Sequence, residues 1–263
     1  MQLTVCIETL FPDRPCVDRC ALVRELGISG IELWGLPANR VEEVEVALGR
    51  TGCQLQLFCG NRDFSLIDPS EREPFLAELQ QSIAHAARLG SPCLTILSDK
   101  VDARGIPIAP TRALTSDERT ASILEGLRRA VTYADSANVT LLLEPLNTLV
   151  DHPGFTLADS RSALEIVRQI GSPRLKLLYD VYHMQVMEGN LIATMEANLG
   201  EIGHIHVADV PGRHEPGTGE IHFHNIARML RASGYAGCVG LECVPRGRSE
   251  NAVSAFCDVF RRA

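Results

Sequence analysis

The chain has 263 residues, of which 45% are hydrophobic, and its 33 acidic residues outnumber its 25 lysines and arginines to give a net charge of -8. This length can bury a large core and predicts one domain spanning residues 1–263. The net charge and the lack of a basic stripe argue against nucleic acid or anionic membrane as a partner. The apolar runs are strand-sized and the first residues carry no leader-like segment, so we expect a cytoplasmic protein.

Short β-rich runs alternate with segments of helical periodicity along the whole chain. The predicted strands begin near Leu3, Gly30, Cys53, Pro92, Val139, Leu175, Gly203 and Gly237. Glycines fall where the helices should end, as the left-handed capping conformation favours: Gly27, Gly52, Gly90, Gly171, Gly200 and Gly234.

This order of elements predicts an α/β fold, a single (β/α)8 barrel. The alternative is an open, doubly wound sheet, but no Gly-x-Gly-x-x-Gly follows the first strand and the chain has no Walker loop. The strand-to-helix connections are long and rich in Pro, Gly, Asp, His and Arg, which is how barrels build a site at one rim. These connections are residues 60–70, 99–114, 145–158 and 209–221.

Four acidic or imidazole residues each stand at the end of an apolar run: Glu144, Asp180, His206 and Glu242. In a parallel barrel these four strand ends meet at one mouth. Three carboxylates and one imidazole suit Mn²⁺ or Mg²⁺ better than a thiolate-preferring metal. Taken singly, each residue could instead be a helix cap or an ion-pair partner. Four at equivalent positions favour a divalent metal site.

Two other strand ends carry candidate residues. Glu32 and Trp34 end the second run, where a carboxylate and an aromatic ring could contact substrate, and we predict Glu32 as a substrate-binding residue. The alternative is a core tryptophan beside a paired glutamate. His204 and His206 share one face of the seventh run by alternation. We predict His206 as a ligand and His204 as a buried, hydrogen-bonding histidine.

Two longer stretches resemble a known family. Residues 179–189 read Tyr-Asp-Val-Tyr-His-Met-Gln-Val-Met-Glu-Gly, and residues 203–221 run from Gly-His-Ile-His-Val-Ala-Asp through Arg-His-Glu-Pro-Gly to Glu-Ile. With Glu-Pro-Leu-Asn at 144–147, they resemble the hydroxypyruvate isomerase family, which lies among the xylose isomerase-like TIM barrels. The match is strong from 141 to 242, and residues 30–34 are its best anchor in the first third.

The resemblance implies roles for particular residues. Family members hold a divalent metal, here expected to be Mn²⁺ or Mg²⁺, on residues that match Glu144, Asp180, His206 and Glu242. Glu144 and Glu242 are also the expected proton-transfer groups, while His183 and Arg213 match positions near the substrate's oxygens. The alternative for His183 is capping or packing at the start of the sixth helix.

The implied activity is a metal-dependent isomerase. It would interconvert a short hydroxy-keto compound, such as hydroxypyruvate, and its aldehyde isomer, tartronate semialdehyde, by proton transfer through an enediolate. His206 departs from the glutamine common in hydroxypyruvate isomerases and matches ketose epimerases. The alternative is therefore a ketose 3-epimerase, or an inosose-processing epimerase or dehydratase.

The predicted partner is a small-molecule sugar or 2-oxo acid, with no nucleic acid and no membrane. Cleavage of abasic DNA, which endonuclease IV performs on the same architecture, is disfavoured because its trinuclear zinc site needs additional histidines and no basic surface is indicated. A non-catalytic sugar-binding barrel is also disfavoured. The sequence is compatible with a homo-oligomer.

Overall fold

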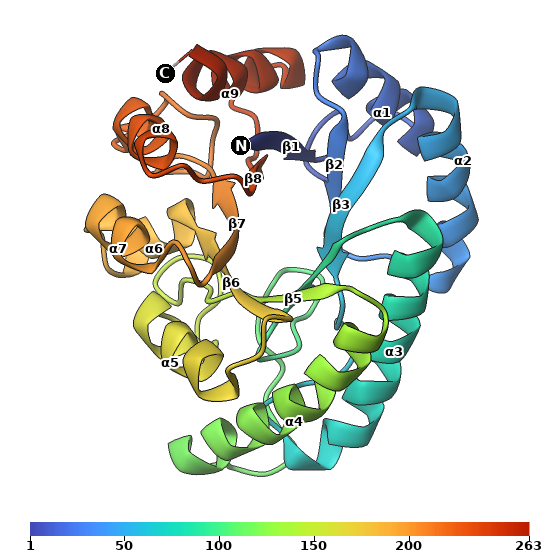
Figure 1. Cartoon of the computed structure of the whole chain (residues 1–263), viewed down its shortest axis with the longest axis vertical. Coiled ribbons are helices and arrows are strands. Elements are labelled where there is room, and N and C mark those ends of the chain that lie inside the picture. Colours follow the sequence, from blue (N-terminus) through green and yellow to red (C-terminus); the bar gives the residue numbers. More distant parts are fainter. Residues whose placement is uncertain (263) are drawn as a thin grey trace.

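Parallel strands close into a barrel in chain order, as Figure 1 shows for the computed structural model, which describes residues 1–262. The eight strands of the described chain are β1 (Gln2–Cys6), β2 (Gly30–Leu33), β3 (Gln54–Cys59), β4 (Cys93–Ile96), β5 (Thr140–Leu143), β6 (Leu175–Asp180), β7 (Ile202–Val207) and β8 (Cys238–Leu241). The barrel closes where β1 pairs with β8 and Thr4 lies beside Gly240. The predicted (β/α)8 barrel is confirmed, and each strand begins within one residue of its predicted start.

Helices form an outer layer around the strands (Figure 1). They are α1 (Cys16–Glu25), α2 (Val41–Thr51), α3 (Arg72–Leu89), α4 (Ser116–Ser136), α5 (Ser160–Ile170), α6 (Val181–Met187), α7 (Leu191–Asn198), α8 (Phe223–Ala232) and α9 (Ser249–Arg262), with short 3₁₀ turns at Ala38–Arg40 and Pro69–Glu71. Five of the glycines predicted to end helices have the expected positive φ: Gly27, Gly52, Gly90, Gly171 and Gly234. Gly200 also follows a helix end, since α7 ends at Asn198, but its predicted left-handed conformation was wrong: the capping residue Leu199 is right-handed and Gly200 does not have a positive φ.

Alternation along the strands separates the barrel interior from the outer core. Leu141 and Leu143 of β5 belong to the main apolar core, which joins strands to helices. Leu142 instead clusters with Leu57 and Leu178. Because side chains two residues apart share a face, the residue after β5 that continues the Leu142 face is Glu144. The same step leads from Leu178 to Asp180, so the interior row ends in carboxylates on both strands.

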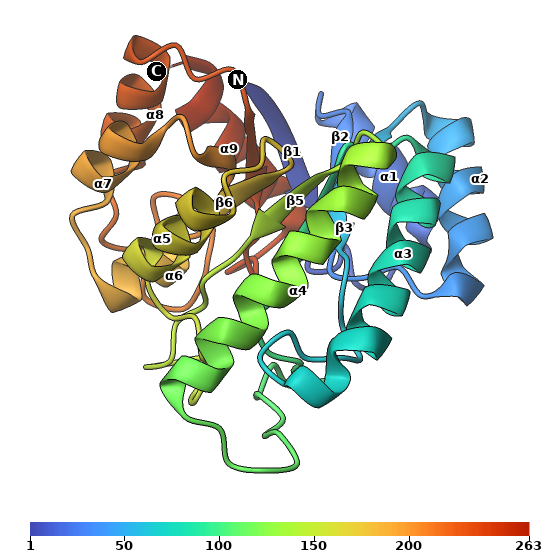
Figure 2. The same cartoon turned by 60° about the horizontal axis from the view of Figure 1, so that its bottom comes forward.

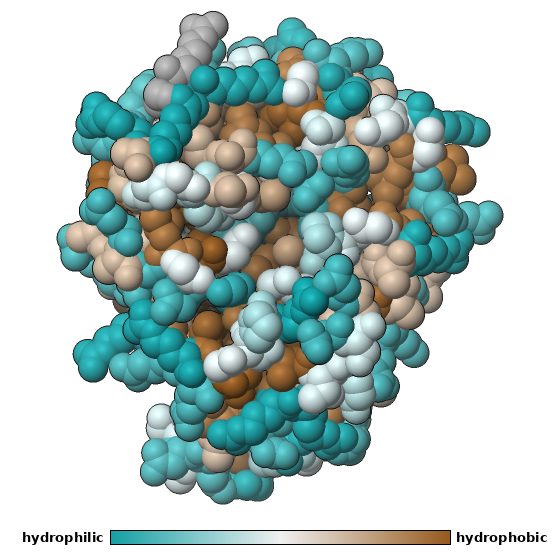
Figure 3. Space-filling model, in the orientation of Figure 1, coloured by the Kyte–Doolittle hydropathy of each residue, from teal (hydrophilic) through white to brown (hydrophobic). Residues whose placement is uncertain are grey.

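Long loops leave the carboxyl ends of the strands. Figure 2 shows the connection between β4 and α4 extending well beyond the barrel, at the bottom of the view. Within it, Val101 and Pro107 form an isolated antiparallel bridge that folds the loop back on itself. In the view of Figure 1, Figure 3 shows polar side chains around the edge of the molecule and apolar atoms between them toward its middle. Among residues 1–262, no helix combines the length and apolar content needed to cross a membrane.

The close approach of β7 to its neighbours gives a stability prediction. A Cβ at Gly203 would lie 2.7 Å from Leu142 Cδ2 and 2.9 Å from Lys176 Cβ, whereas one at Gly49 in α2 would meet nothing within 4 Å. We expect Gly203→Ala to lower the free energy of unfolding by about 1–3 kcal/mol through overpacking. Gly49→Ala should raise it by about 0.5–1 kcal/mol because alanine favours the helix. Urea unfolding of both variants checks this, and an unchanged midpoint for Gly203→Ala would contradict it.

Candidate functional site

The four predicted ligand residues converge at the carboxyl ends of β5 to β8. One oxygen or nitrogen atom from each lies within 4.8 Å of the others, and all four residues are buried: Glu144, Asp180, His206 and Glu242. Register explains the convergence, since Asp180 pairs with His206 across β6 and β7. The backbone N–H of Glu242 donates to Val207 O at the end of β7. The local strand pattern and the closed barrel together form the cluster.

The ring of His206 is oriented with one nitrogen toward the carboxylates of the cluster. Its Nε2 lies 2.9 Å from Glu32 Oε2. Its Nδ1 lies 3.5 Å from Glu242 Oε2 and 3.7 Å from Glu144 Oε1, and it has no hydrogen-bond partner although it is buried. An unpaired buried nitrogen costs free energy. A hard divalent cation between the three carboxylates would satisfy this atom, so the residues fit such an ion.

Asp180 has two roles that use different oxygens. Oδ1 accepts the backbone N–H groups of Tyr182 and His183 at 2.8 and 3.3 Å and so caps α6. Oδ2 faces Arg213 Nη2 at 3.5 Å. Burial raises the pKa of Asp180 to about 6, and the nearby Arg213 charge only partly opposes this. The capping interpretation and the ligand interpretation are therefore compatible.

Glu144 and Glu242 have opposite electrostatic environments. Burial raises the pKa of Glu144 above its ordinary value, and the charge of Glu242 adds to this effect. Burial would also raise the pKa of Glu242, but Arg213 and His206 outweigh it and hold that pKa below the ordinary value. Arg213 forms an ion pair with Glu242 and lies 5.2 Å over the ring of Tyr182. Two carboxylates whose pKa values are pushed apart are typical of paired proton-transfer groups.

The loop that carries Arg213 is organised by one buried carboxylate. Asp209 is fully buried, and its two oxygens accept backbone N–H groups from Val210, Gly217, Gly219 and Ile221 at 2.9–3.0 Å. Arg213 itself adopts a left-handed φ of 56°. These contacts fold residues 209–221 back over the end of β7, which brings Arg213 to the carboxylates.

His183 presents a single defined nitrogen to the site. Its Nδ1 lies 3.1 Å from the backbone nitrogen of Asn147 and 2.7 Å from the Asn147 side-chain nitrogen, so Nδ1 accepts. Burial and the charge of Arg213 hold the pKa of His183 well below its ordinary value, which keeps the ring neutral. The proton therefore lies on Nε2, which is buried without a hydrogen-bond partner. It lies 3.6 Å from Asp180 Oδ2, too far for a hydrogen bond, so this N–H is available to donate to a ligand.

A cavity of about 450 Å³ opens above the cluster. Glu144, Glu242, His183 and Arg213 line it, but Glu32 does not, because the Glu32 carboxylate lies behind His206. Trp34 also lines it. Its side chain is 45% exposed, and its indole N–H donates to Glu242 Oε1 at 2.6 Å. The alternative of a core tryptophan was therefore wrong.

The sequence interpretation missed cavity residues that come from loop interiors. His152 lines the cavity, and its Nδ1 lies 2.6 Å from Gly105 O, which joins the loop after β5 to the loop after β4. Arg62 and Arg104 line the same cavity. None of the three stands at a strand end, so strand periodicity could not single them out. The only signal was their membership of long, polar loops.

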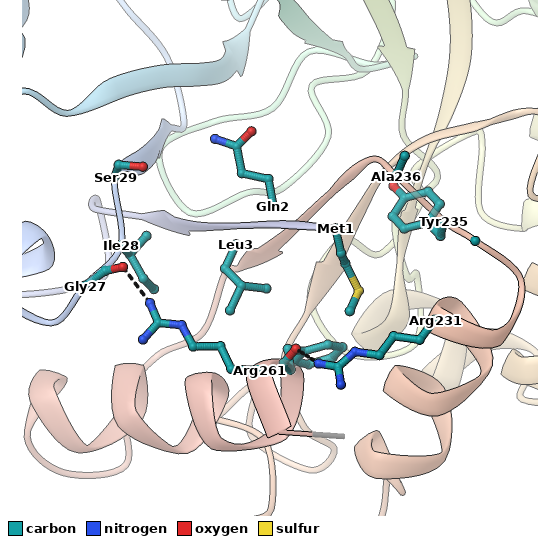
Figure 4. Close-up of a pocket in the computed structure, with 12 residues that line it drawn as sticks. Met1, Gln2, Leu3, Gly27, Ile28, Ser29, Arg231, Tyr235, Ala236 and Arg261 are labelled. Atoms are coloured by element: carbon teal, nitrogen blue, oxygen red, sulfur yellow. Dashed lines mark hydrogen bonds between the residues drawn. The ribbon is translucent and has the colours of Figure 1, made fainter.

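A larger cavity of about 660 Å³ lies at the opposite end of the barrel, where Met1 and Ser29 immediately precede β1 and β2. Figure 4 shows its two arginines already hydrogen-bonded to backbone carbonyls: Arg261 to Gly27 O, and Arg231 to Phe260 O. It contains no cluster of carboxylates or imidazoles among its lining residues, all of which the structure describes. The chemistry therefore favours the smaller cavity.

Comparisons with known proteins agree with this geometry. A family model described as a xylose isomerase-like TIM barrel matches residues 20–262. The chain belongs to this family. It is 31% identical over 252 residues to hydroxypyruvate isomerase of Escherichia coli K12, covering 93% of both chains, which confirms the resemblance inferred from the sequence. It is 29% identical to 3-dehydro-D-guloside 4-epimerase of the same organism, covering 95% of this chain and 94% of the relative.

A solved structure of similar shape is entitled AP endonuclease, family 2, from Brucella melitensis. It has a TM-score of 0.88 and 25% identity, covering 97% of this chain and 98% of that one. The sequence relatives indicate an isomerase-type enzyme that acts on a small molecule. The four-residue cluster supplies groups that could hold a metal ion.

The single tryptophan provides a direct test of ion binding. Trp34 donates to Glu242, so an ion held by the cluster should alter its emission, and the paramagnetic Mn²⁺ should quench it saturably. EDTA should reverse the change. Asp180→Asn removes one negative charge of the cluster without touching Trp34, so we expect it to shift the midpoint to higher Mn²⁺ concentration. A midpoint identical to that of the wild type would place the ion elsewhere, and Trp34→Phe gives the background signal.

Proposed function

We propose that the chain is a metal-assisted isomerase of short hydroxy-keto compounds, with hydroxypyruvate and its aldehyde isomer tartronate semialdehyde as the leading pair. The observation that carries this proposal is the unpaired Nδ1 of His206 surrounded by three buried carboxylates at the mouth of the barrel. The relative named hydroxypyruvate isomerase supports the substrate choice. The expected ion is Mn²⁺ or Mg²⁺, because the donors are mainly oxygens.

The reaction moves one proton between neighbouring carbons. A base removes a proton from C3 of hydroxypyruvate, leaving an enediolate. A proton returned to C2, together with transfer of the C3 hydroxyl proton to the C2 oxygen, gives the aldehyde. A divalent ion, when bound, would stabilise the negative charge that develops on the two neighbouring oxygens. Glu144, Asp180, His206 and Glu242 would hold the ion. No atoms are gained or lost overall, so no co-substrate is needed.

The protein's own groups would divide the remaining work. Glu144 and Glu242 come from strands on different sides of the cavity and would take and return the proton. His183 would donate its Nε2–H to a substrate oxygen, since that atom forms no hydrogen bond within the protein and lies 3.6 Å from Asp180 Oδ2. Arg213 would hold Glu242 in its ionised form and orient it through their ion pair. Under this proposal Glu32 has no substrate contact.

The second candidate is epimerisation of a larger keto sugar. It is supported by the imidazole at position 206, by a relative named 3-dehydro-D-guloside 4-epimerase, and by a cavity of about 450 Å³. Two carboxylates on opposite sides of one carbon could remove a proton from one face and deliver it to the other. A 1,2-shift can use a single carboxylate for both steps.

Replacing each carboxylate by its amide tests the proton-transfer assignment. Glu144→Gln and Glu242→Gln keep the shape but remove the base, so we expect turnover to fall by about 100- to 10,000-fold with the fold intact. The assay is NMR in deuterated water with Mn²⁺- or Mg²⁺-loaded enzyme and a panel of hydroxypyruvate, 2-oxo acids, ketoses and inososes. Near-normal turnover in both variants would exclude the assignment.

The position of deuterium in the product separates the two candidates. Isomerisation places deuterium on the carbon next to the original site, whereas epimerisation replaces the proton on the same carbon with inversion. Unequal losses in the two variants favour isomerisation, because one carboxylate then does most of the transfer. Loss of water from the substrate would instead identify a dehydratase.

Metal affinity should depend on pH through His206. Burial lowers its pKa in the metal-free protein, but Glu242 and Glu32 outweigh burial and raise that pKa well above its ordinary value. Below the raised pKa, Nδ1 carries a proton that must leave before an ion binds, so Mn²⁺ affinity should increase as pH rises toward it. His206→Gln keeps a ligand oxygen without this proton, and its affinity should vary less with pH. Equal affinity and equal pH dependence in calorimetric titrations of both proteins would mean that His206 is not a ligand.

A further inference from the structure

Glu32 is a fully enclosed carboxylate at the centre of the barrel. Its side chain is 1% exposed, although Glu32 is the third of the four residues of β2 and lies near the cavity. Its Oε1 accepts a hydrogen bond from the hydroxyl of Thr4 and lies 2.9 Å from His204 Nε2. The other oxygen lies 2.9 Å from His206 Nε2. Thr4 and His206 each form a hydrogen bond to one of the two oxygens, which leaves neither directed at a substrate.

The barrel leaves room for this carboxylate at one position of β8. A Cβ built on Gly240 would overlap both oxygens of Glu32. Gly240 pairs with Thr4 on one side and with His206 on the other, so these two contacts of Glu32 lie at the level of Gly240 in the barrel. Because Gly240 has no side chain, the Glu32 side chain can extend through the barrel interior to the imidazole of His206 on β7.

The contact with Glu32 decides which nitrogen of His206 can bind an ion. A carboxylate accepts hydrogen bonds, so Nε2 must carry the proton, and the neutral ring then has its lone pair on Nδ1. That atom is the one that faces Glu144 and Glu242 without a partner. We propose that Glu32 is a positioning residue for the metal site, which fixes the Nε2–H form and the orientation of His206 so that Nδ1 can bind the ion.

This proposal rests on the proposed metal-assisted function and assigns to Glu32 a role distinct from substrate binding. A carboxylate behind a ligand histidine increases the basicity of the ring and fixes its rotation. The hydroxyl of Thr4 holds the carboxylate in place by donating to the Glu32 oxygen that does not face His206, and His204 Nε2 lies 2.9 Å from the same oxygen without forming a hydrogen bond. The ion itself would not touch Glu32, since the His206 ring lies between them.

A double-mutant cycle in Mn²⁺ affinity tests the proposal. Calorimetry on the metal-free full-length protein compares the wild type, Glu32→Gln, His206→Gln and the double variant. We expect Glu32→Gln to weaken Mn²⁺ binding about 10- to 100-fold when residue 206 is histidine. In the His206→Gln background the same change should have little effect, because no imidazole remains to be oriented.

Glu8→Gln is the matched control. Glu8 follows β1 at the same end of the barrel and pairs with Arg40 at 2.9 Å, so the substitution removes one negative charge without contacting the cluster. We expect unchanged Mn²⁺ affinity. Thermal unfolding of every variant without metal establishes that it is folded before titration.

A wild-type measurement does not depend on whether the variants fold. In ¹⁵N NMR of the Mg²⁺-loaded wild type, His206 should show a protonated Nε2 and an unprotonated Nδ1. The opposite assignment would overturn the proposal. It would also be overturned by an equal loss of Mn²⁺ affinity in both backgrounds, which means a general charge effect, or by no loss in either.

Stoichiometry distinguishes positioning from ligation. Glu32, His204 and His206 could themselves hold a cation. Two ions bound by the wild type and one by Glu32→Gln would overturn the positioning role and make Glu32 a ligand. If the wild type binds neither Mn²⁺ nor Mg²⁺, the proposed function itself fails. Normal wild-type binding that Glu32→Gln leaves unchanged overturns only the role of Glu32.

Discussion

The site depends on the enclosure of several carboxylates at one end of a narrow barrel. Their mutual repulsion and loss of hydration must be compensated locally, because little water reaches them. The carboxylates are those of Glu32, Glu144, Asp180 and Glu242. Arg213 supplies a fixed positive charge to two of them. The imidazole of His206 contacts two others, and a bound divalent ion would provide the charge that these residues lack.

Much of this arrangement follows from strand periodicity. In a parallel barrel both faces of a strand are buried, so strands read as short apolar runs, and a charged residue at the end of such a run marks the mouth. Glu144 after Leu141, Leu142 and Leu143 illustrates the rule. The positions of the strands, the barrel and the four-residue cluster could therefore be predicted from local sequence.

Contacts across the barrel could not be predicted in this way. The place of Glu32 behind His206 depends on the missing side chain at Gly240, more than 200 residues away in the chain. The contact of Trp34 with Glu242 and that of His152 with Gly105 depend on how long loops fold over the mouth. Local patterns carry no information on these distances, which are set by barrel register and loop geometry. Asp180 was ambiguous between cap and ligand because one of its oxygens caps α6 while the other faces Arg213 and the cluster.

The anchoring of residues 209–221 by Asp209 has a consequence for how this scaffold can diversify. Four backbone amides of the loop bind one carboxylate, and backbone amides are present whatever the side chains are. The side chains of Arg213 and His214 can therefore change while the path of the chain stays the same. The glycines of the loop are exceptions: Gly212 and Gly217 have a φ of 92°, and a side chain at Gly219 would strike Val210 O. Substitutions at the tip of this loop can therefore change which substrates the barrel accepts without changing the backbone that Asp209 holds.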